Sequence, residues 1–188
     1  MSYKLSQLRV LVVDDNQPIR MLIRSLLMDL GVGLVDMADG GESGWREYLK
    51  KKPDIVIVDW RMKDVDGIEL TRRVRTDSQS HTPHTPIVMT TGFTSKERVF
   101  LARDAGVTEF LIKPFTVQGL ARHLVHVVEN PRQFVVSPHF TGPDRRRRAD
   151  DVDVPNMKRG GDKEQIVKKS KKSAKYLDLR GGRQENKG

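Results

Sequence analysis

Four short apolar runs in this chain each end at a side chain that can bind a metal ion or a phosphoryl group. Asp14 and Asp15 follow the first run, Asp59 the second, Thr91 the third and Lys113 the fourth. If these runs are neighbouring parallel strands, their carboxyl ends lie at one edge of a sheet, where the side chains converge. Each residue alone is also typical of a helix cap, a loop or a strand end. Their coincidence at four ends predicts a shared site.

The predicted cluster has the groups that phosphoryl transfer needs. Three carboxylates within about 4 Å repel one another by several kcal/mol per pair at the effective dielectric of a partly buried site, so a cation must lie among them. An all-oxygen ligand set with few protein ligands suits Mg²⁺, which keeps several waters and shares phosphate oxygens. A carboxylate nucleophile beside a metal, a lysine and a hydroxyl favours phosphoryl transfer, because positioning and charge neutralisation supply most of that catalysis.

Alternating strands and helices must position these residues. Strands are predicted at residues 8–13, 34–38, 55–58, 86–90 and 110–112, and a helical pattern follows each one. The four β-branched residues at 55–58 are typical of a central parallel strand covered on both faces. Five strands alternating with five helices predict a doubly wound α/β fold.

Caps and apolar spacing indicate where the helices lie. Asn16 is predicted to cap the first helix and Ser95 the fourth, and Trp45 of the second helix is expected in the core. The first helix has an apolar face made of Ile19, Leu22, Ile23, Leu26 and Leu27. His81 and His84 lie in a polar loop with no cysteine nearby, which favours an exposed loop over a metal site.

Charge divides the chain into two parts. Residues 1–130 contain 18 Lys+Arg and 17 Asp+Glu, a net charge of +1, whereas residues 131–188 contain 16 and 8, a net charge of +8. Only 10 of the last 58 residues are Leu, Ile, Val or Phe, which is too few for a core of their own. We therefore expect a globular domain at 1–130 and a basic, mostly disordered extension at 131–188.

Composition also excludes several classes of protein. No apolar run approaches the roughly 20 residues of a membrane span, and the N-terminal residues contain no secretory apolar region. The chain has no cysteine, so it has neither disulfides nor thiolate metal sites. A cytoplasmic protein that is not transmembrane is expected.

Residues 8–130 resemble a receiver domain of the bacterial two-component response regulators. The matching motifs are Val12-Val13-Asp14-Asp15, Val58-Asp59 with Met62, Asp66 and Gly67, Thr90-Thr91-Gly92, and Phe110-Leu111-Ile112-Lys113-Pro114-Phe115. They occur in the family's order and cover about two thirds of the chain. The resemblance implies a flavodoxin-like five-stranded parallel sheet in the order 2-1-3-4-5.

The resemblance also implies a role for each acidic residue. Asp59 would accept a phosphoryl group from a sensor histidine kinase or a phosphotransfer protein. Asp15, Asp59 and the backbone carbonyl of Arg61 would bind Mg²⁺ directly, and Asp14 would contribute through water.

The remaining motif residues would bind the phosphoryl group and report its presence. Lys113 and Thr91 would each contact a phosphoryl oxygen, and Pro114 would follow a cis peptide bond. Phe110 would be the switch aromatic, which turns inward once Thr91 moves toward the phosphate.

Three residues depart from the common pattern of the family. Lys63 stands where many receivers have proline, which loosens the loop after Asp59 without removing a ligand. Arg61 and Phe93 occupy positions that tune loss of the phosphoryl group in this family. Both are bulky, so we expect them to restrict the attacking water and to lengthen the phosphorylated state.

The C-terminal extension contains two distinctive stretches and leaves the output open. Residues 134–144 are apolar and aromatic and precede four arginines at 145–148; they either dock on the domain or a partner, or form a flexible linker. The lysine-rich run at 168–175 is able to bind nucleic acid or anionic lipid weakly.

The leading interpretation is a receiver that acts through an unknown downstream protein, using its fourth helix, fifth strand and fifth helix. The alternative is a phosphorylation-gated binder of nucleic acid or anionic membranes; an unphosphorylated scaffold is disfavoured because no acidic residue is missing.

Overall fold

Five parallel strands form the central sheet of the protein. The computed structural model describes residues 5–92, 95–137 and 140–144. The sheet contains β1 (Arg9–Val13), β2 (Leu34–Ala38), β3 (Ile55–Asp59), β4 (Ile87–Thr91) and β5 (Glu109–Ile112). Their order is β2-β1-β3-β4-β5, and every pair is parallel. The predicted doubly wound, flavodoxin-like sheet is confirmed.

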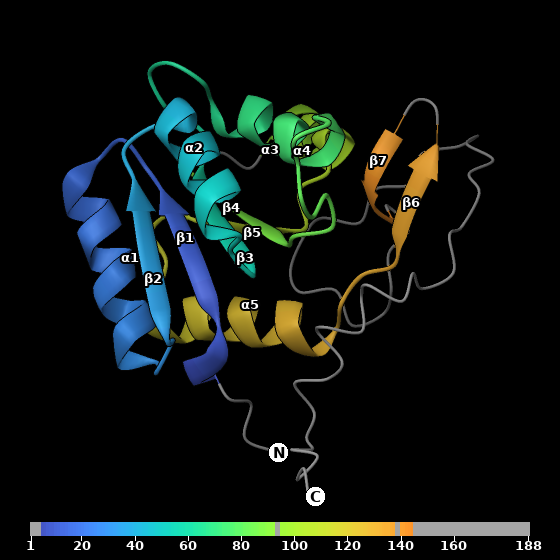
Figure 1. The fold of residues 1–188 in the computed structure, drawn as a ribbon. Coiled ribbons are helices and arrows are strands. Elements are labelled where there is room, and N and C mark those ends of the chain that lie inside the picture. The colour runs from blue at the N-terminus through green and yellow to red at the C-terminus, as the bar shows by residue number, and fades with distance from the viewer. Residues whose placement is uncertain (1–4, 93–94, 138–139, 145–188) are drawn as a thin grey trace, which may run out of the picture.

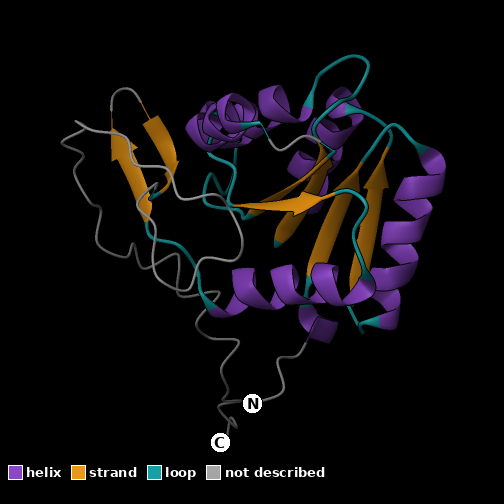
Figure 2. Ribbon diagram, turned by 180° about the vertical axis from the view of Figure 1, so that it is seen from behind, coloured by secondary structure: helices purple, strands orange, loops and turns teal. Residues whose placement is uncertain are grey.

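Helices cover both faces of this sheet (Figures 1 and 2). The helices are α1 (Gln17–Asp29), α2 (Gly41–Lys51), α3 (Gly67–Thr76), α4 (Lys96–Ala105) and α5 (Val117–Glu129), and a short 3₁₀ helix (Leu5–Gln7) precedes β1. One apolar cluster joins α1 and α5 to one face of the sheet, and a second joins α2, α3 and α4 to the other. In the described part of the chain, no helix is long and apolar enough to cross a membrane.

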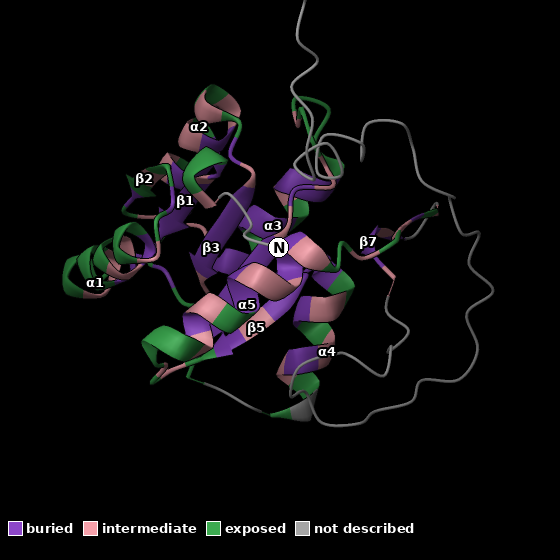
Figure 3. Ribbon diagram, turned by 90° about the horizontal axis from the view of Figure 1, so that it is seen from below, coloured by how far each residue is buried: buried purple, intermediate pink, exposed green. Residues whose placement is uncertain are grey.

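The central strands are buried on both sides, as their continuous apolar sequence predicts. Val10 to Val13 of β1 and Ile55 to Val58 of β3 are each at most 1% exposed. Figure 3 shows these strands in the interior, with exposed residues on the outer side of α1. Trp45 lies in the core as expected. This rigid centre sets the positions of the residues at the strand ends.

The helices follow the sequence signals with two exceptions, one at a helix end and one on an apolar face. The Asn16 side chain accepts a hydrogen bond from the backbone of Ile19, as an N-cap should. Ser95 occupies the N-cap position of α4, but its side chain makes no capping hydrogen bond. Leu22, expected on the apolar face of α1, is 53% exposed, because Ile23 and Leu27 make the buried contact with the sheet. The prediction for Leu22 was therefore wrong.

A second, two-stranded sheet follows α5. Strands β6 (Phe134–Ser137) and β7 (Phe140–Pro143) are antiparallel, and β7 contacts α3 and α4. Val135 and Phe140 are buried, which shows that this hairpin packs on the domain. The packed structure therefore continues past the predicted boundary at residue 130. Of the two alternatives for this segment, the structure shows docking on the domain for the described residues 134–137 and 140–144.

Charged and aromatic contacts hold the hairpin in place. The guanidinium of Arg75, at the end of α3, donates to the carbonyls of Gly106, Pro83 and Thr85 and lies 5.1 Å from the centre of the Phe134 ring. Arg132 lies 3.3 Å from the buried carboxylate of Glu109, the first residue of β5. These contacts place the hairpin near the amino end of the sheet, away from the predicted site.

The hairpin also changes the surroundings of His84. The His84 ring meets the Phe134 ring edge-on at 4.4 Å between centroids. His84 is therefore half-buried, although an exposed loop was expected, and only His81 is exposed. Burial, with the nearby Arg75 charge, lowers the pKa of His84.

Replacing Phe140 with alanine tests whether the hairpin is part of the folded domain. Because the Phe140 side chain is buried, Phe140→Ala should lower the free energy of unfolding by about 2–4 kcal/mol. Val136→Ala is the control, since Val136 is 47% exposed on the same hairpin, and it should change stability by less than about 0.5 kcal/mol. Urea unfolding followed by tryptophan fluorescence measures the stability of both variants. If Phe140→Ala lowers the free energy of unfolding no more than the small change expected for the control, the hairpin does not stabilise the domain.

Candidate functional site

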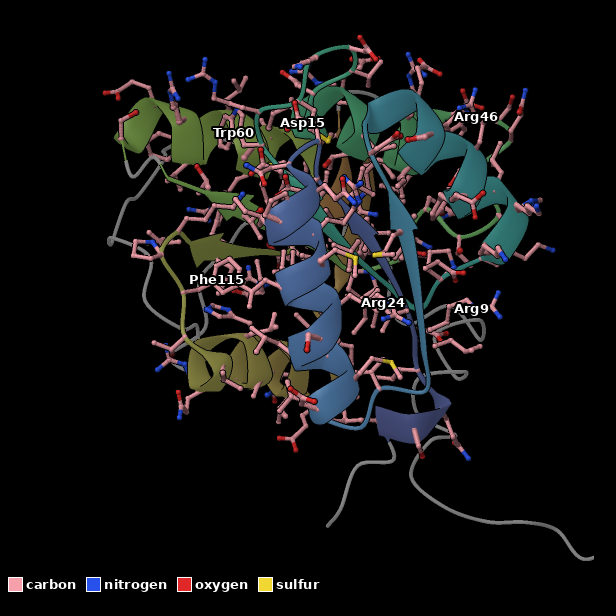
Figure 4. All side chains as sticks on the ribbon, turned by 90° about the vertical axis from the view of Figure 1, so that its left-hand side faces the viewer. Arg9, Asp15, Arg24, Arg46, Trp60 and Phe115 are labelled. Carbon is pink, nitrogen blue, oxygen red and sulfur yellow. The ribbon has the colours of Figure 1, made fainter. Side chains whose placement is uncertain are left out.

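The predicted site residues meet at the carboxyl edge of the sheet. Asp14 and Asp15 follow β1, Asp59 ends β3, Thr91 ends β4 and Lys113 follows β5. The parallel pairing aligns these strand ends, with Val13 beside Val58 and Thr91 beside Ile112. Figure 4 shows Asp15 and Trp60, which follows Asp59, at the same end of the molecule.

The three carboxylates form a compact cluster with one ammonium group. Asp14, Asp15 and Asp59 each place an oxygen within 4.8 Å of the others. Lys113 Nζ lies 2.9 Å from Asp14 Oδ2 and 2.7 Å from Asp59 Oδ1. The predicted convergence is therefore present for the ends of β1, β3 and β5.

Backbone groups orient two of the carboxylates. Asp14 Oδ1 accepts a 2.8 Å hydrogen bond from the backbone N–H of Asn16. Asp59 Oδ2 accepts a 2.9 Å hydrogen bond from the backbone N–H of Arg61, whose side chain is exposed. Arg20 also donates to the carbonyl of Asp14. The loops after β1 and β3 thus hold these side chains toward the shared pocket.

The charge of the cluster is only partly balanced. Three carboxylates and one ammonium leave a net charge of −2 on Asp14, Asp15, Asp59 and Lys113. Burial acts to lower the pKa of Lys113, but its hydrogen bonds to Asp59 and Asp14 outweigh burial and the net shift is upward. Because folding raises this pKa, the stability that Lys113 contributes is fully present at any pH below the ordinary pKa of lysine. It is lost as the pH rises through the raised pKa of the folded protein.

The excess negative charge and the oxygen-only donor set fit a divalent cation. Asp15 is partly exposed, and it accepts no hydrogen bond from any residue in the described ranges. Its carboxylate is therefore available to a metal ion, whereas Asp14 and Asp59 already share Lys113. Carboxylate oxygens that are accessible to solvent are suitable ligands for Mg²⁺, which keeps several of its waters.

A hydroxyl that was not singled out from the sequence, that of Thr90, contacts Asp59, while the role predicted for Thr91 concerns a phosphoryl oxygen and stays a prediction. Thr90 Oγ1 lies 3.2 Å from Asp59 Oδ1, whereas Thr91 is buried and its carbonyl accepts a 2.8 Å hydrogen bond from the backbone of Lys113. Both threonines are visible in the sequence, but only the strand register shows that Thr90 is the residue beside Asp59.

The structure also places two other residues that the family resemblance singled out, Phe110 and Pro114. Phe110 is partly buried and packs against the apolar cluster under α3 and α4. The peptide bond between Lys113 and Pro114 is cis, as the family resemblance implied. Phe93 lies outside the described residues.

The fold and the site together define a class of protein: a flavodoxin-like signalling domain with an acidic pocket that fits phosphorylation. The family model for the response regulator receiver domain matches residues 10–125. This chain therefore belongs to the response regulator receiver family. The hairpin and residues 145–188 lie beyond the matched region.

Relatives of known name agree with this assignment. The chain is 33% identical over 122 residues to the chemotaxis protein CheY-3 of Vibrio cholerae, which covers 65% of this chain and 92% of that protein. It is also 33% identical over 122 residues to the chemotaxis protein CheY of Pseudomonas aeruginosa, covering 65% of this chain and 97% of that protein. Both relatives are named as chemotaxis proteins.

Solved structures show the same fold. The chemotaxis protein CheY4 of Vibrio cholerae matches with a TM-score of 0.60 and 34% identity, covering 64% of this chain and 98% of that chain. The receiver domain of the sensor histidine kinase PA1611 from Pseudomonas aeruginosa matches with a TM-score of 0.57 and 26% identity, covering 63% of this chain and 95% of that chain. That structure holds a magnesium ion in its active-site cleft.

Neutralising Asp15 should stabilise the protein when no divalent cation is present. Asp15 repels two carboxylates within 4.8 Å, so Asp15→Asn should raise the free energy of unfolding by about 1 kcal/mol after allowance for solvent screening. The exposed Asp64 provides the control, since Asp64→Asn removes a charge outside the cluster. Urea unfolding in a chelating buffer is the measurement, and a less stable Asp15→Asn protein would contradict the repulsion argument.

Proposed function

We propose that Asp59 accepts a phosphoryl group from a sensor histidine kinase or a phosphotransfer protein in the cytoplasm. The protein would then signal through phosphorylation-dependent contacts with a downstream protein. The observation that carries this proposal is the Asp59 carboxylate, which Lys113 contacts at 2.7 Å beside two further carboxylates. A carboxylate held in this way is a suitable nucleophile for a phosphoryl group.

In this proposal Asp15, Asp59 and the backbone carbonyl of Arg61 would hold Mg²⁺, and Asp14 would contribute through water. When bound, the ion neutralises charge on the transferring group. The net charge of the cluster supports this assignment, as does the absence of hydrogen bonds to Asp15 from the described residues.

The other side chains bind the incoming group. Lys113 Nζ, which contacts Asp14 and Asp59 in this structure, would exchange a carboxylate for a phosphoryl oxygen. Thr91, at the end of β4, would donate its hydroxyl to a second phosphoryl oxygen. Phe110 would then turn further into the apolar cluster against which it already packs. These movements would alter the surface formed by α4, β5 and α5.

The chemistry of the chain itself is limited to its own carboxylate. It would take a phosphoryl group from small phosphodonors and lose it to water, without turning over a separate substrate. The protein is therefore proposed to be a phosphoacceptor rather than an enzyme.

Replacing Asp59 tests this function directly. Wild-type protein incubated with radiolabelled acetyl phosphate and Mg²⁺ should become labelled, whereas Asp59→Asn should lose at least about 95% of the label because the amide cannot act as the nucleophile. Asp64→Asn, an exposed acidic position, should be labelled like wild type. Persistent labelling of Asp59→Asn would mean that the acceptor lies elsewhere.

The Mg²⁺ assignment further requires that Mg²⁺ raise the free energy of unfolding of the wild type more than that of Asp15→Asn.

The same label reports on the loop residues. If Arg61 and Phe93 shield the phosphoryl group from water, the wild type should lose its label more slowly than an Arg61→Asn, Phe93→Glu variant. A faster loss from the wild type would contradict this proposal.

A second candidate function is phosphorylation-gated binding of nucleic acid or anionic membranes through the tail. Residues 145–188 contain 15 Lys+Arg and 7 Asp+Glu, a net charge of +8. Polycations of this kind bind polyanions with a strong dependence on salt.

Removing residues 145–188 tests the second function. A chain that ends at residue 144 keeps the packed hairpin, so it is the right comparison for the full chain. If the tail is the output, full-length protein should bind DNA, RNA or anionic vesicles in low salt at least about tenfold more tightly than the shortened chain, and this difference should shrink as salt rises. Equal binding by both chains, measured by titration, would eliminate this candidate.

A further inference from the structure

Thr90 is the residue of β4 that lies beside Asp59 in the parallel register. Its side chain is fully buried, with 0% exposure. A β-branched side chain on a buried strand has little rotational freedom. The Thr90 hydroxyl is therefore held in place next to the carboxylate.

The hydroxyl has two acceptors in reach and one proton to donate. Asp59 Oδ1 lies 3.2 Å away and the carbonyl of Val58 lies 3.5 Å away. The shorter distance and the negative charge of the carboxylate both favour Asp59 as the acceptor. This contact gives Thr90 a chemical role that a strand residue chosen only for packing would not have.

We propose that the Thr90 hydroxyl shortens the lifetime of the phosphorylated protein by stabilising the Asp59 carboxylate as it is released. This inference rests on the proposed function of Asp59 as phosphoacceptor. It assigns to Thr90 an effect opposite to the shielding proposed for Arg61 and Phe93.

The step concerned is hydrolysis of the aspartyl phosphate. The oxygen of a water molecule forms a bond to phosphorus while the bond between phosphorus and the Asp59 oxygen breaks. The electron pair of the broken bond returns to Asp59, which becomes a carboxylate. Both water protons leave with the phosphate as H₂PO₄⁻, so the two negative charges of the acyl phosphate are shared between the two products.

The effect on rate follows from how the charge on Asp59 changes. In the acyl phosphate, neither oxygen of Asp59 carries the full charge of a carboxylate, whichever of them holds the phosphorus. A hydrogen bond from Thr90 is therefore weaker in the phosphorylated state and strengthens as the carboxylate forms. An interaction that is stronger in the transition state than in the ground state accelerates the step.

Lys113 contacts the same oxygen but differs from Thr90 in one respect. Its ammonium is on a long flexible side chain and is proposed to move to the phosphoryl group. Thr90 is fixed in the strand and remains at the Asp59 oxygen throughout. The hydroxyl is thus able to act on the leaving carboxylate after Lys113 has moved.

Removing the hydroxyl while keeping the side-chain shape tests this role. Wild type, Thr90→Val, Thr90→Ala and Thr90→Ser are labelled with acetyl phosphate and Mg²⁺, the donor is removed, and the first-order loss of label is followed. The two variants without a hydroxyl should lose label about fivefold more slowly, the ratio expected when a hydrogen bond to a charged acceptor is replaced by one to a neutral acceptor. Thr90→Ser should restore a rate within about twofold of wild type.

A second buried threonine separates chemistry from stability. Thr108 accepts a hydrogen bond from the backbone of Ile87 near the opposite edge of the sheet, so Thr108→Val should lower stability without changing the loss of label. The inference is overturned if Thr90→Val and Thr90→Ala lose label as fast as wild type, or if Thr90→Ser is as slow as they are. A wild type that takes up no label at all would instead refute the phosphoacceptor function itself, and with it the basis for this role of Thr90.

Discussion

Mutual repulsion of Asp14, Asp15 and Asp59 is the constraint that this structure has to satisfy. Carboxylates do not gather within 4.8 Å unless a rigid frame holds them. The frame is the parallel pairing of β1 with β3, whose buried residues lock the two strand ends side by side. Lys113, which follows the carboxyl end of β5, offsets part of the charge. The remaining negative charge makes the pocket suited to a cation and a phosphoryl group.

A hairpin packs near the amino ends of the strands, opposite the acidic cluster. There, the hairpin of β6 and β7 packs on α3 and α4, Arg75 contacts Phe134 of the hairpin, and Glu109 pairs with Arg132, which precedes β6. The hairpin belongs to the folded unit although it lies beyond the region matched by the receiver family. Helix α4 consequently contacts the hairpin and also forms part of the proposed signalling surface, which links the extension physically to that surface.

Two sets of contacts around Asp59 would set how long a signal lasts. Lys113 and the proposed metal ligands would favour gain of the phosphoryl group, while the Thr90 hydroxyl is proposed to favour its loss. These groups approach the same carboxylate from β5, β1 and β4. A single side chain at the end of β3 would thus be subject to opposing influences from the two strands that flank it and from β5 beyond β4.

The sequence by itself determined the alternation of strands and helices and the acidic pocket, because buried β-branched runs that end in polar residues are typical of a parallel α/β fold. The strand order came from the resemblance to the receiver family, and the structure confirms it. The sequence also determined that Trp45 is in the core and that Asn16 caps α1. Only the tertiary structure decided that Thr90 contacts Asp59, that Leu22 is exposed and that Phe134 covers His84. Each of these depends on register or on packing between distant segments, and the local sequence carries no information about which surface a neighbouring segment will cover.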